Sequence, residues 1–302
     1  MARFTNYQDL ENEETSKFWG IGKWNNYIAP YLPKPEDCKD LIYIDMGCNA
    51  GQFCRFAEDW GFGRVIGVDH NRKAINKGIK WRDEHGYHYD LQYRRMEDAL
   101  PHLPVCDYIS FINSHYYILV QDWLRMLDYM HTKTRYVIIT STRKKEYYCA
   151  APANSKYIKR CFKHNWDLVG SVPQLPREGD PRPRSLSSMC FKSKTLERVS
   201  IDKLLRGHHI QGNFHEQIEK GVHPLKTRYF KMLCRRVANK GVPMKVLEKK
   251  MLNKVKMYGD IKKNGILEPI ITNKWYRVLD GNHRSKILPF LGYKETNVRR
   301  LI

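Results

Sequence analysis

Two short segments of the chain carry residues whose types and spacing suit the binding of a small ligand. In the first, the apolar run LIYID ends in Asp45 and is followed by Gly47 and Gly51. Glycines let the backbone turn tightly and approach a ligand closely. A second apolar run ends in Asp69, and an acid at that place can accept hydrogen bonds from the hydroxyls of a ribose. The segment therefore predicts a nucleoside site.

The second segment, DGNHR, predicts an anion site near the end of the sequence. Gly281 permits a turn from an expected strand into an expected helix, and a helix start presents free N–H groups and the positive end of its dipole. Arg284, in the first turn, can donate two parallel hydrogen bonds to a phosphate. The residues predicted to bind phosphate or nucleotide are Asp280, Gly281, Asn282, His283 and Arg284.

Strands and helices that alternate along the chain would position the first segment. Such alternation is typical of a parallel α/β sheet with helices on both faces. A Pro-, Gly- and Arg-rich loop near residue 180 separates two later strands and predicts a terminal antiparallel hairpin. The expected strands are 41–46, 64–69, 91–96, 107–113, 135–142, 167–173 and 185–193, and the expected helices are 51–62, 121–133 and 153–165.

A second strand and helix pattern begins after Lys194, which predicts two domains, 1–195 and 196–302. The second is expected to be a smaller α+β domain. Its long basic helix is expected to end at Gly265, because glycine is common just after a helix. The expected elements are a strand and turn over 196–205, a helix over 244–265, strands over 268–272, 276–280 and 296–302, and a helix from Asn282.

Charge is unevenly divided between these two parts. The chain of 302 residues has 53 Lys and Arg against 32 Asp and Glu, a net charge of +21. Residues 196–302 hold 24 of the basic and 9 of the acidic residues, so +15 of the excess belongs to them. A strongly basic domain is expected to bind an anionic partner such as DNA, RNA or a nucleotide.

Several classes of protein are excluded by composition. A hydrophobic content of 42% is too high for a disordered chain. The sequence contains no run of eighteen apolar residues, so it predicts no membrane span. Its polar, acidic start does not resemble a secretory signal. The eight cysteines form no C-x-x-C pair and no set with metal-ligand spacing. We expect reduced, mostly buried cysteines, no metal site and a cytoplasmic location.

The motif D-M-G-C-N-A-G after its strand resembles the first motif of class I S-adenosylmethionine-dependent methyltransferases. The resemblance covers about residues 20–195 and implies a Rossmann-like sheet that binds S-adenosylmethionine. A dinucleotide-binding Rossmann domain is the alternative, but it would have a glycine in place of Asn49. The cofactor-binding residues that the resemblance implies are Asp45, Gly47, Cys48, Asn49, Gly51, Asp69, His70, Glu97, Asp98 and Asn113.

The segment after the fourth strand, Asn113-Ser114-His115-Tyr116, is where a methyl acceptor would be handled. His115 is the candidate catalytic residue, either as a general base or as a histidine that only shapes the pocket. DNA amino-methyltransferases carry a D/N-P-P-Y/F motif here, and the absence of proline disfavours methylation of an exocyclic base amine.

Residues from Leu196 to the end resemble the ParB/sulfiredoxin-like superfamily, in which G-I-x-x-P-I and a strand precede a motif like D-G-N-H-R. The resemblance implies ATP or CTP, with Mg²⁺, as a ligand. Members include DNA clamps, small-molecule kinases and sulfiredoxins; Asn282 stands where sulfiredoxins have cysteine, which disfavours that chemistry. A degenerate domain that only packs is the alternative.

Together these features predict an S-adenosylmethionine-dependent methyltransferase whose substrate is an anionic, phosphate-bearing nucleic acid, nucleotide or metabolite. A ParB-like domain would bind nucleotide or substrate. A nucleic-acid-binding ParB-like protein, in which the methyltransferase fold is a scaffold or cofactor sensor, is the first alternative. Small-molecule kinase activity in the second domain is a weaker one.

Overall fold

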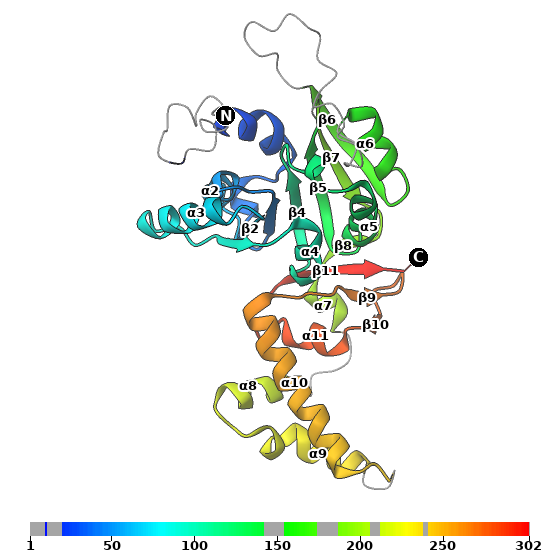
Figure 1. Cartoon of the computed structure of the whole chain (residues 1–302). Helices are drawn as coiled ribbons and strands as arrows, with labels where there is room; N and C mark the ends of the chain where they lie inside the picture. Colours follow the sequence, from blue (N-terminus) through cyan, green and yellow to red (C-terminus); the bar gives the residue numbers. More distant parts are fainter. Residues whose placement is uncertain are drawn as a thin grey trace, which may run out of the picture. The chain divides into compact units, whose positions relative to one another are not determined.

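The computed structural model describes residues 10, 20–141, 154–173, 187–205, 212–237 and 241–301. The chain divides into two compact units (Figure 1). The first comprises 1–102 and 106–196, and the second comprises 103–105 and 197–302. The Pro-, Gly- and Arg-rich loop expected near residue 180 lies outside the described residues.

The first unit is built on a seven-stranded sheet of order β3-β2-β1-β4-β5-β7-β6. Neighbours from β3 to β5 pair in parallel, and β7 pairs antiparallel with both β5 and β6. The predicted Rossmann-like, mostly parallel sheet is thus confirmed. Its strands are β1 (Ile42–Met46), β2 (Arg64–Asp69), β3 (Asp90–Tyr93), β4 (Cys106–Phe111), β5 (Thr134–Thr140), β6 (Trp166–Pro173) and β7 (Ser187–Ser193).

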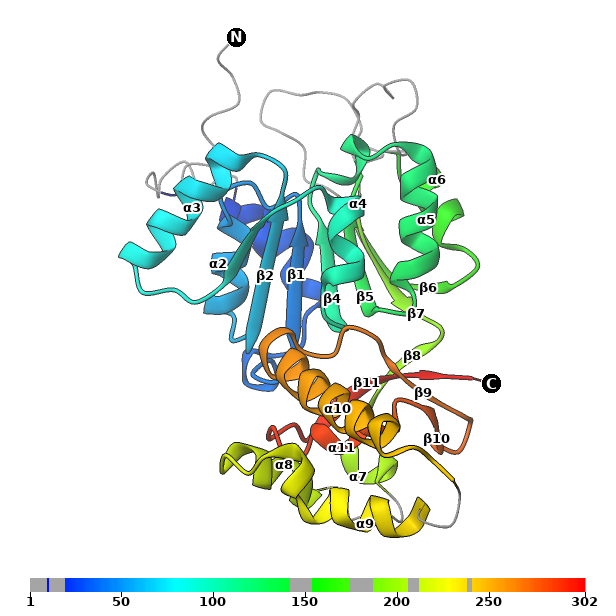
Figure 2. The same cartoon turned by 60° about the horizontal axis from the view of Figure 1, so that its bottom comes forward.

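Helical segments cover both faces of this sheet (Figures 1 and 2). On one face, Trp24 of the π-helix Trp24–Ile28 packs against Tyr43 of β1 and Phe56 of α2. On the other, Trp123 of α5 packs edge-on against Phe111 of β4. The helices of this unit are α2 (Gln52–Asp59), α3 (Arg72–Glu84), α4 (Met96–Ala99), α5 (Val120–Met130) and α6 (Ser155–Phe162).

The strand order reverses at the centre of the sheet, between β1 and β4. β2 follows β1 in sequence and lies on one side of it, whereas β4 lies on the other side. Connections from the two strands therefore leave in opposite directions, which opens a crevice at their carboxyl ends. The segments that follow β1 and β4 begin at Gly47 and Ile112, so this topology positions both parts of the predicted site.

The second unit has a four-stranded sheet of order β10-β9-β11-β8. β9 pairs antiparallel with β10 and parallel with β11. A separate helical core contains Phe214, Phe230, Leu247 and Met251. The elements are β8 (Leu196–Ser200), α7 (Ile201–Leu204), α8 (Gly212–Glu219), α9 (Arg228–Val237), α10 (Met244–Asn264), β9 (Ile270–Thr272), β10 (Val278–Asp280), α11 (Asn282–Ile287) and β11 (Glu295–Arg300).

Several local expectations differ from the structure. No element is predicted from the sequence over 206–243, yet α8 and α9 form there. No helix is predicted between β2 and β3 either, yet α3 forms there, with Asn71 accepting a hydrogen bond from the Ala74 amide as its N-cap. The strand expected over 91–96 ends at Tyr93, and Met96 begins α4 instead. Within the described ranges, no helix has the length and apolar character needed to cross a bilayer.

Candidate functional site

The loop between β1 and α2 has an unusual backbone. Gly47, Asn49 and Gly51 all adopt positive φ, at 82°, 53° and 88°. At Gly47 a side chain is also excluded by space, because a Cβ there would lie 2.3 Å from the Cβ of Ser114. The predicted glycines are therefore required for the path of the chain, and Asn49 supplies a third left-handed position that the sequence did not reveal.

Asp69, at the end of β2, joins this loop to the start of α3. Its Oδ2 accepts a hydrogen bond of 2.8 Å from the Asn49 amide, and its Oδ1 accepts one of 2.7 Å from the Asn71 amide. The side chain is buried. Since each carboxylate oxygen has two lone pairs, each retains acceptor capacity for a ligand.

The segment after β4 forms the opposite wall. Asn113 has a φ of 56°, a strained conformation of a kind that clusters at functional sites. Thr140 of β5 holds it: the Asn113 amide donates to the Thr140 hydroxyl at 2.9 Å, and that hydroxyl lies 3.2 Å from Asn113 Oδ1. Ser114 donates to the Met46 carbonyl at the end of β1, which ties the two central connections together.

A cleft of about 630 Å³ lies between these segments. Ligand pockets commonly have volumes of about 300–1,000 Å³. The residues that line it are Gly47, Cys48, Asn49, Ala50, Gln52, Phe53, Asp69, His70, Asn71, Arg72, Lys73, Met96, Ile112, Asn113, Ser114 and Tyr117.

Six of the ten predicted cofactor-binding residues line this cleft and four do not. Glu97 and Asp98 lie in α4, where Glu97 is 3.7 Å from Arg95 and Asp98 is exposed. Gly51 is buried as the N-cap of α2, so its part is to start that helix. The six lining residues are Gly47, Cys48, Asn49, Asp69, His70 and Asn113.

Asp45 is buried in β1 and is not among the residues that line the cleft. Tyr43 donates to the Ser110 hydroxyl, which donates to Asp45 Oδ1 at 2.7 Å. The Oδ2 atom has no hydrogen-bond partner within the described part of the chain. Burial raises the pKa of Asp45 to about 7; the hydrogen bond from Ser110 opposes this shift, and the charge of Asp69 adds a smaller increase.

His115 does not line the cleft either. The short helical turn His115–Tyr117 places its imidazole at 0% exposure, with ring centroids of Tyr116 and Trp123 each 5.5 Å away. A general base must reach the proton that it removes. The structure therefore favours the alternative in which His115 packs, and it gives no support to a catalytic role.

Other lining residues were missed by the sequence analysis. Most stand within a few positions of a residue that was singled out: Gln52 and Phe53 follow Gly51, and Arg72 and Lys73 follow His70. Their proximity to the ends of β1 and β2 was the signal from which these residues could have been found in the sequence. Gln52 is notable because it is buried and its Nε2 lacks a hydrogen-bond partner among the described residues.

The predicted anion site at 280–284 has a different arrangement from the one expected. Gly281 has a φ of 88° at the start of α11, as a tight turn requires. However, Arg284 donates to Asp280 Oδ2 at 2.7 Å and to the Glu268 carbonyl at 2.6 Å. The guanidinium expected to bind phosphate is thus already engaged within the fold. Asn282 is exposed, whereas His283 is half-buried and lines a separate cavity.

Comparisons with known proteins concern the first unit. A family model described as a methyltransferase domain matches residues 19–173, just over half of the chain. Among solved structures, a Pyrococcus horikoshii OT3 protein is 13% identical with a TM-score of 0.48, covering 63% of this chain and 96% of that one. Magnesium protoporphyrin IX methyltransferase from Synechocystis PCC 6803, with bound SAM, is 14% identical with a TM-score of 0.48, covering 63% and 88%. No curated protein sequence matches.

Proposed function

This chain belongs to the methyltransferase domain family and is an S-adenosylmethionine-dependent methyltransferase, and we propose that the cleft after β1, β2 and β4 holds the methyl donor. The observation that carries this assignment is Asp69, a buried carboxylate fixed by two backbone amides at the cleft wall. Its geometry suits the two hydroxyls of a ribose, because its oxygens are held in place before a ligand arrives.

The residues of the cleft fit the donor. The unpartnered Nε2 of Gln52 is a buried donor for which a ligand carboxylate would be an acceptor, and such a donor is costly to leave unpaired. Gly47 lines the cleft without a side chain of its own, and its positive φ lets the backbone turn there beside Ser114. Met96 and Ile112 are buried apolar residues at the cleft and suit the faces of a base.

The bound donor would supply an electrophilic methyl group on a sulfonium. The chain's own contribution is to hold the reactants in one geometry, which converts a bimolecular step into an effectively unimolecular one. Asp69 would fix the ribose, Gln52 the carboxylate, and the strained Asn113 would stand at the wall where the acceptor approaches. Because His115 is buried, we assign it no proton transfer.

The acceptor is anionic and carries phosphate under this proposal. The side chains of His70, Arg72 and Lys73 lie at the cleft and are exposed. Asp69 is the sole carboxylate among the described lining residues, and its charge is already compensated by backbone amides. A cleft with more basic than acidic side chains raises the local concentration of an anion.

The second unit would be a ParB/sulfiredoxin-like domain that binds the substrate or a nucleotide. Support comes from its mixed sheet, from the positive φ of Gly281 before α11, and from the net charge of +15 over residues 196–302. Since Arg284 is engaged with Asp280, the phosphate contacts must come from other basic residues.

Calorimetry and methyl transfer test the proposal on the full chain. S-adenosylmethionine is expected to bind at one site per chain. Methyl-labelled donor is then mixed with separate pools of RNA, DNA, nucleotides and sugar phosphates, and label is expected in a phosphate-bearing pool. Failure to bind the donor would overturn the cleft assignment. Donor binding with transfer to none of the pools would overturn the anionic acceptor, and nucleic-acid binding without transfer would favour the scaffold alternative.

A further inference from the structure

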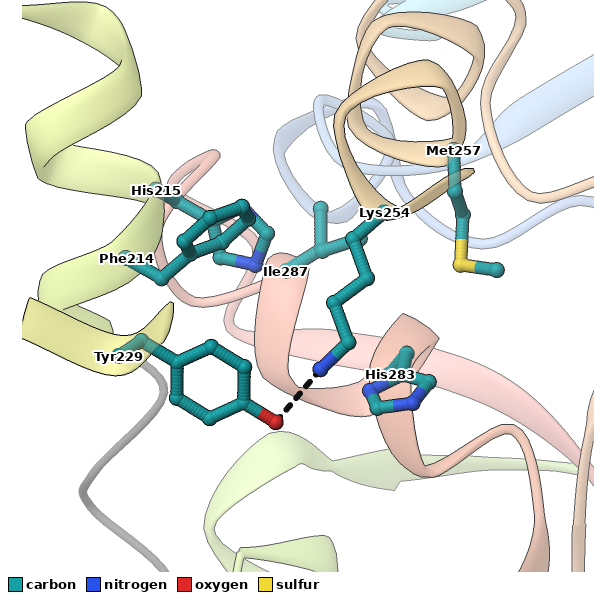
Figure 3. A pocket seen from close by; sticks show the side chains of 7 residues that line it. All are labelled: Phe214, His215, Tyr229, Lys254, Met257, His283 and Ile287. Atoms are coloured by element: carbon teal, nitrogen blue, oxygen red, sulfur yellow. Dashed lines mark hydrogen bonds between the residues drawn. The ribbon is translucent and has the colours of Figure 1, made fainter. Parts of the chain in front are cut away.

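The cavity among α8, α9, α10 and α11 of the second unit is too small for a phosphate group. Its volume is about 10 Å³, which is room for about one water molecule. Lys254 lies beside it and donates a hydrogen bond of 2.7 Å to the Tyr229 hydroxyl (Figure 3). Arg284 of the predicted anion site donates instead to Asp280 and to the Glu268 carbonyl. A phosphate-bearing ligand of this unit is therefore expected at its surface.

The turn between β9 and β10 presents the most exposed large hydrophobic side chain of the described residues. This side chain is Trp275, which is 72% exposed. The ammonium of Lys274, an exposed residue, lies over the indole ring, 4.5 Å from its centroid. One face of the indole thus carries a positive charge, and most of the remaining ring is open to solvent.

Hydrogen bonds of Asn273 fix the backbone of this turn. Its Oδ1 accepts hydrogen bonds of 3.0 Å from the amides of both Trp275 and Arg277. Its carbonyl accepts one of 3.0 Å from the Tyr276 amide, and its own amide donates one of 3.1 Å to the Arg277 carbonyl. The exposed indole is therefore carried by an ordered backbone, which lowers the cost of ordering the site when a ligand binds.

Tyr276 anchors the turn to the rest of the second unit. Its φ of 62° is rare for a bulky residue, and such strain persists where the surrounding structure enforces it. Its hydroxyl donates a hydrogen bond of 2.9 Å to Glu197 of β8. The ammonium of Lys203 and the guanidinium of Arg300 lie 5.4 and 5.8 Å from its ring centroid. These contacts hold Tyr276 half-buried while the adjacent Trp275 faces solvent.

The charge around the turn is positive. Glu197, the carboxylate that anchors the turn, forms an ion pair of 2.8 Å with Arg300. Lys203 and Lys274 are both exposed, and neither forms an ion pair with another described residue. They belong to a domain with a net charge of +15. An anion is therefore attracted to the same surface that presents the indole.

We propose that this turn binds a single-stranded nucleic acid, with a base stacked on Trp275 and phosphates beside Lys274 and Lys203. Aromatic rings that stack on bases, combined with basic residues that follow the backbone, bind single strands in other proteins. A base must leave its neighbours to lie on the indole, which favours a single strand over a duplex. A protein partner is disfavoured, because lysine is depleted at protein interfaces. The inference rests on the proposed binding of a phosphate-bearing ligand by the second unit, and it makes that ligand a nucleic acid.

Fluorescence anisotropy on the full chain tests this surface. Labelled strands of about 12 deoxythymidines or about 12 uridines, a length within the usual site sizes, are titrated separately at several chloride concentrations. A duplex of equal length is titrated beside them. Saturable binding of a single strand is expected, weakening as salt rises. Binding of DNA, of RNA or of both supports the proposal. The absence of saturable binding, or tighter binding of the duplex, would overturn it.

Substitutions of Trp275 test the stacking. Trp275→Ala is expected to weaken single-strand binding about 5- to 150-fold, the usual range for loss of one stacked base. Trp275→Phe keeps an aromatic ring and is expected to bind within about threefold of the native chain. Tyr157→Ala removes an exposed aromatic side chain from α6 of the first unit and is the matched control, expected to bind as the native chain does. Native affinity in Trp275→Ala would overturn the proposal and would favour a protein partner for the turn.

The charge of Lys274 is tested through the salt dependence. One phosphate contact to a single strand contributes about 0.7 to the slope of log affinity against log salt, so Lys274→Gln is expected to make the slope shallower by about that amount. Lys156→Gln makes the same change at an exposed lysine of α6, and its slope is expected to match that of the native chain. Equal changes in the two variants would show nonspecific attraction and would overturn the site.

Parallel measurements separate this inference from the proposed function. Near-ultraviolet circular dichroism checks that each variant is folded, and S-adenosylmethionine binding is measured on the same samples. Transfer of label to nucleotides or sugar phosphates by a native chain that binds no oligonucleotide would reject this surface alone. Oligonucleotide binding that depends on Trp275, without transfer to any phosphate-bearing pool, would support the surface and reject the proposed acceptor.

Discussion

The two units surround their charged side chains in opposite ways. In the cleft of the first unit, Asp69 is an anion whose oxygens accept hydrogen bonds from two backbone amides. In the second unit, Lys254 of α10 is a half-buried cation that donates a hydrogen bond to the Tyr229 hydroxyl. Backbone amides therefore compensate the charge of Asp69, whereas a neutral hydroxyl contacts the charge of Lys254.

The cleft of the first unit and the cavity of the second also differ in what determines their shape. The cleft depends on the backbone, because Gly47, Asn49, Gly51 and Asn113 all have positive φ. The cavity depends on side chains that project from four helices. Substitutions in the first site should consequently act through backbone displacement, and substitutions in the second through charge. The following predictions test this contrast.

The largest effect is expected from Gly47→Ala. The new methyl group would lie 2.3 Å from Ser114 Cβ, at a φ of 82°, so the loop must move. Displacement of about 1 Å at a binding site can cost about 100-fold, and we expect at least about that loss in affinity for S-adenosylmethionine, measured by calorimetry.

Gly86→Ala is the matched control for this substitution. Gly86 has a φ of 72°, but a Cβ there would meet nothing within 4 Å. It would cause comparable backbone strain, about 1 kcal/mol, without a clash. Thermal denaturation should detect that loss while the affinity for the donor stays within about twofold. Equal donor affinity in the two variants would contradict a site fixed by its backbone.

A smaller loss is expected from Asp69→Asn. The amide nitrogen of asparagine would face a backbone N–H of Asn49 or Asn71, leaving a donor without an acceptor, which costs about 1–3 kcal/mol. Donor affinity should fall about 10- to 100-fold. Asp98→Asn applies the same chemical change to an exposed acid outside the cleft, and it should leave affinity unchanged. If Asp98→Asn weakened binding instead, the original expectation that Asp98 binds the cofactor would be restored.

Asp45 predicts a pH dependence for the first unit. Its pKa is about 7 in the fold against 3.8 for a free carboxyl, so between these values the folded state binds more protons than the unfolded one. Its stabilising contribution is thus complete below about pH 4 and is lost as pH rises through about 7, with a slope of at most about 1.4 kcal/mol per pH unit.

Urea denaturation from pH 5 to pH 8 measures this slope. Asp45→Asn removes the titrating group while keeping its shape, so its stability relative to the native chain should rise across that range. A parallel pH dependence in the two proteins would show that Asp45 does not titrate there. His283 is expected to show the opposite pH dependence, because burial lowers its pKa to about 4. Its contribution to stability therefore rises with pH between about 4 and 6.5.

The contrast between features set by the backbone and features set by side chains also explains which parts of the structure could be predicted from the sequence. Apolar runs that end in Asp45 and Asp69 predicted the strands and the crevice, because strand ends and glycine turns are local features. His115 and Arg284 were harder, since their roles depend on neighbours that only the folded chain supplies. His115 is enclosed by Trp123, and Arg284 turns back onto Asp280 and the Glu268 carbonyl. Motif position gives a residue's backbone place but not its side-chain partners.

Arg284→Gln is expected to have the smallest effect and tests whether an anion binds at the start of α11. Arg284 is 17% exposed and its partner Asp280 is 67% exposed, so the loss of the pair should cost about 1 kcal/mol in unfolding free energy. Phosphate affinity should stay within about threefold of the native chain, because the guanidinium is engaged inside the fold. Arg277→Gln, at an exposed arginine nearby in sequence, controls for the change in net charge. A loss of phosphate binding in Arg284→Gln of about tenfold or more, with Arg277→Gln unaffected, would return the anion to the start of α11, since only a direct contact could make one partly buried guanidinium matter that much.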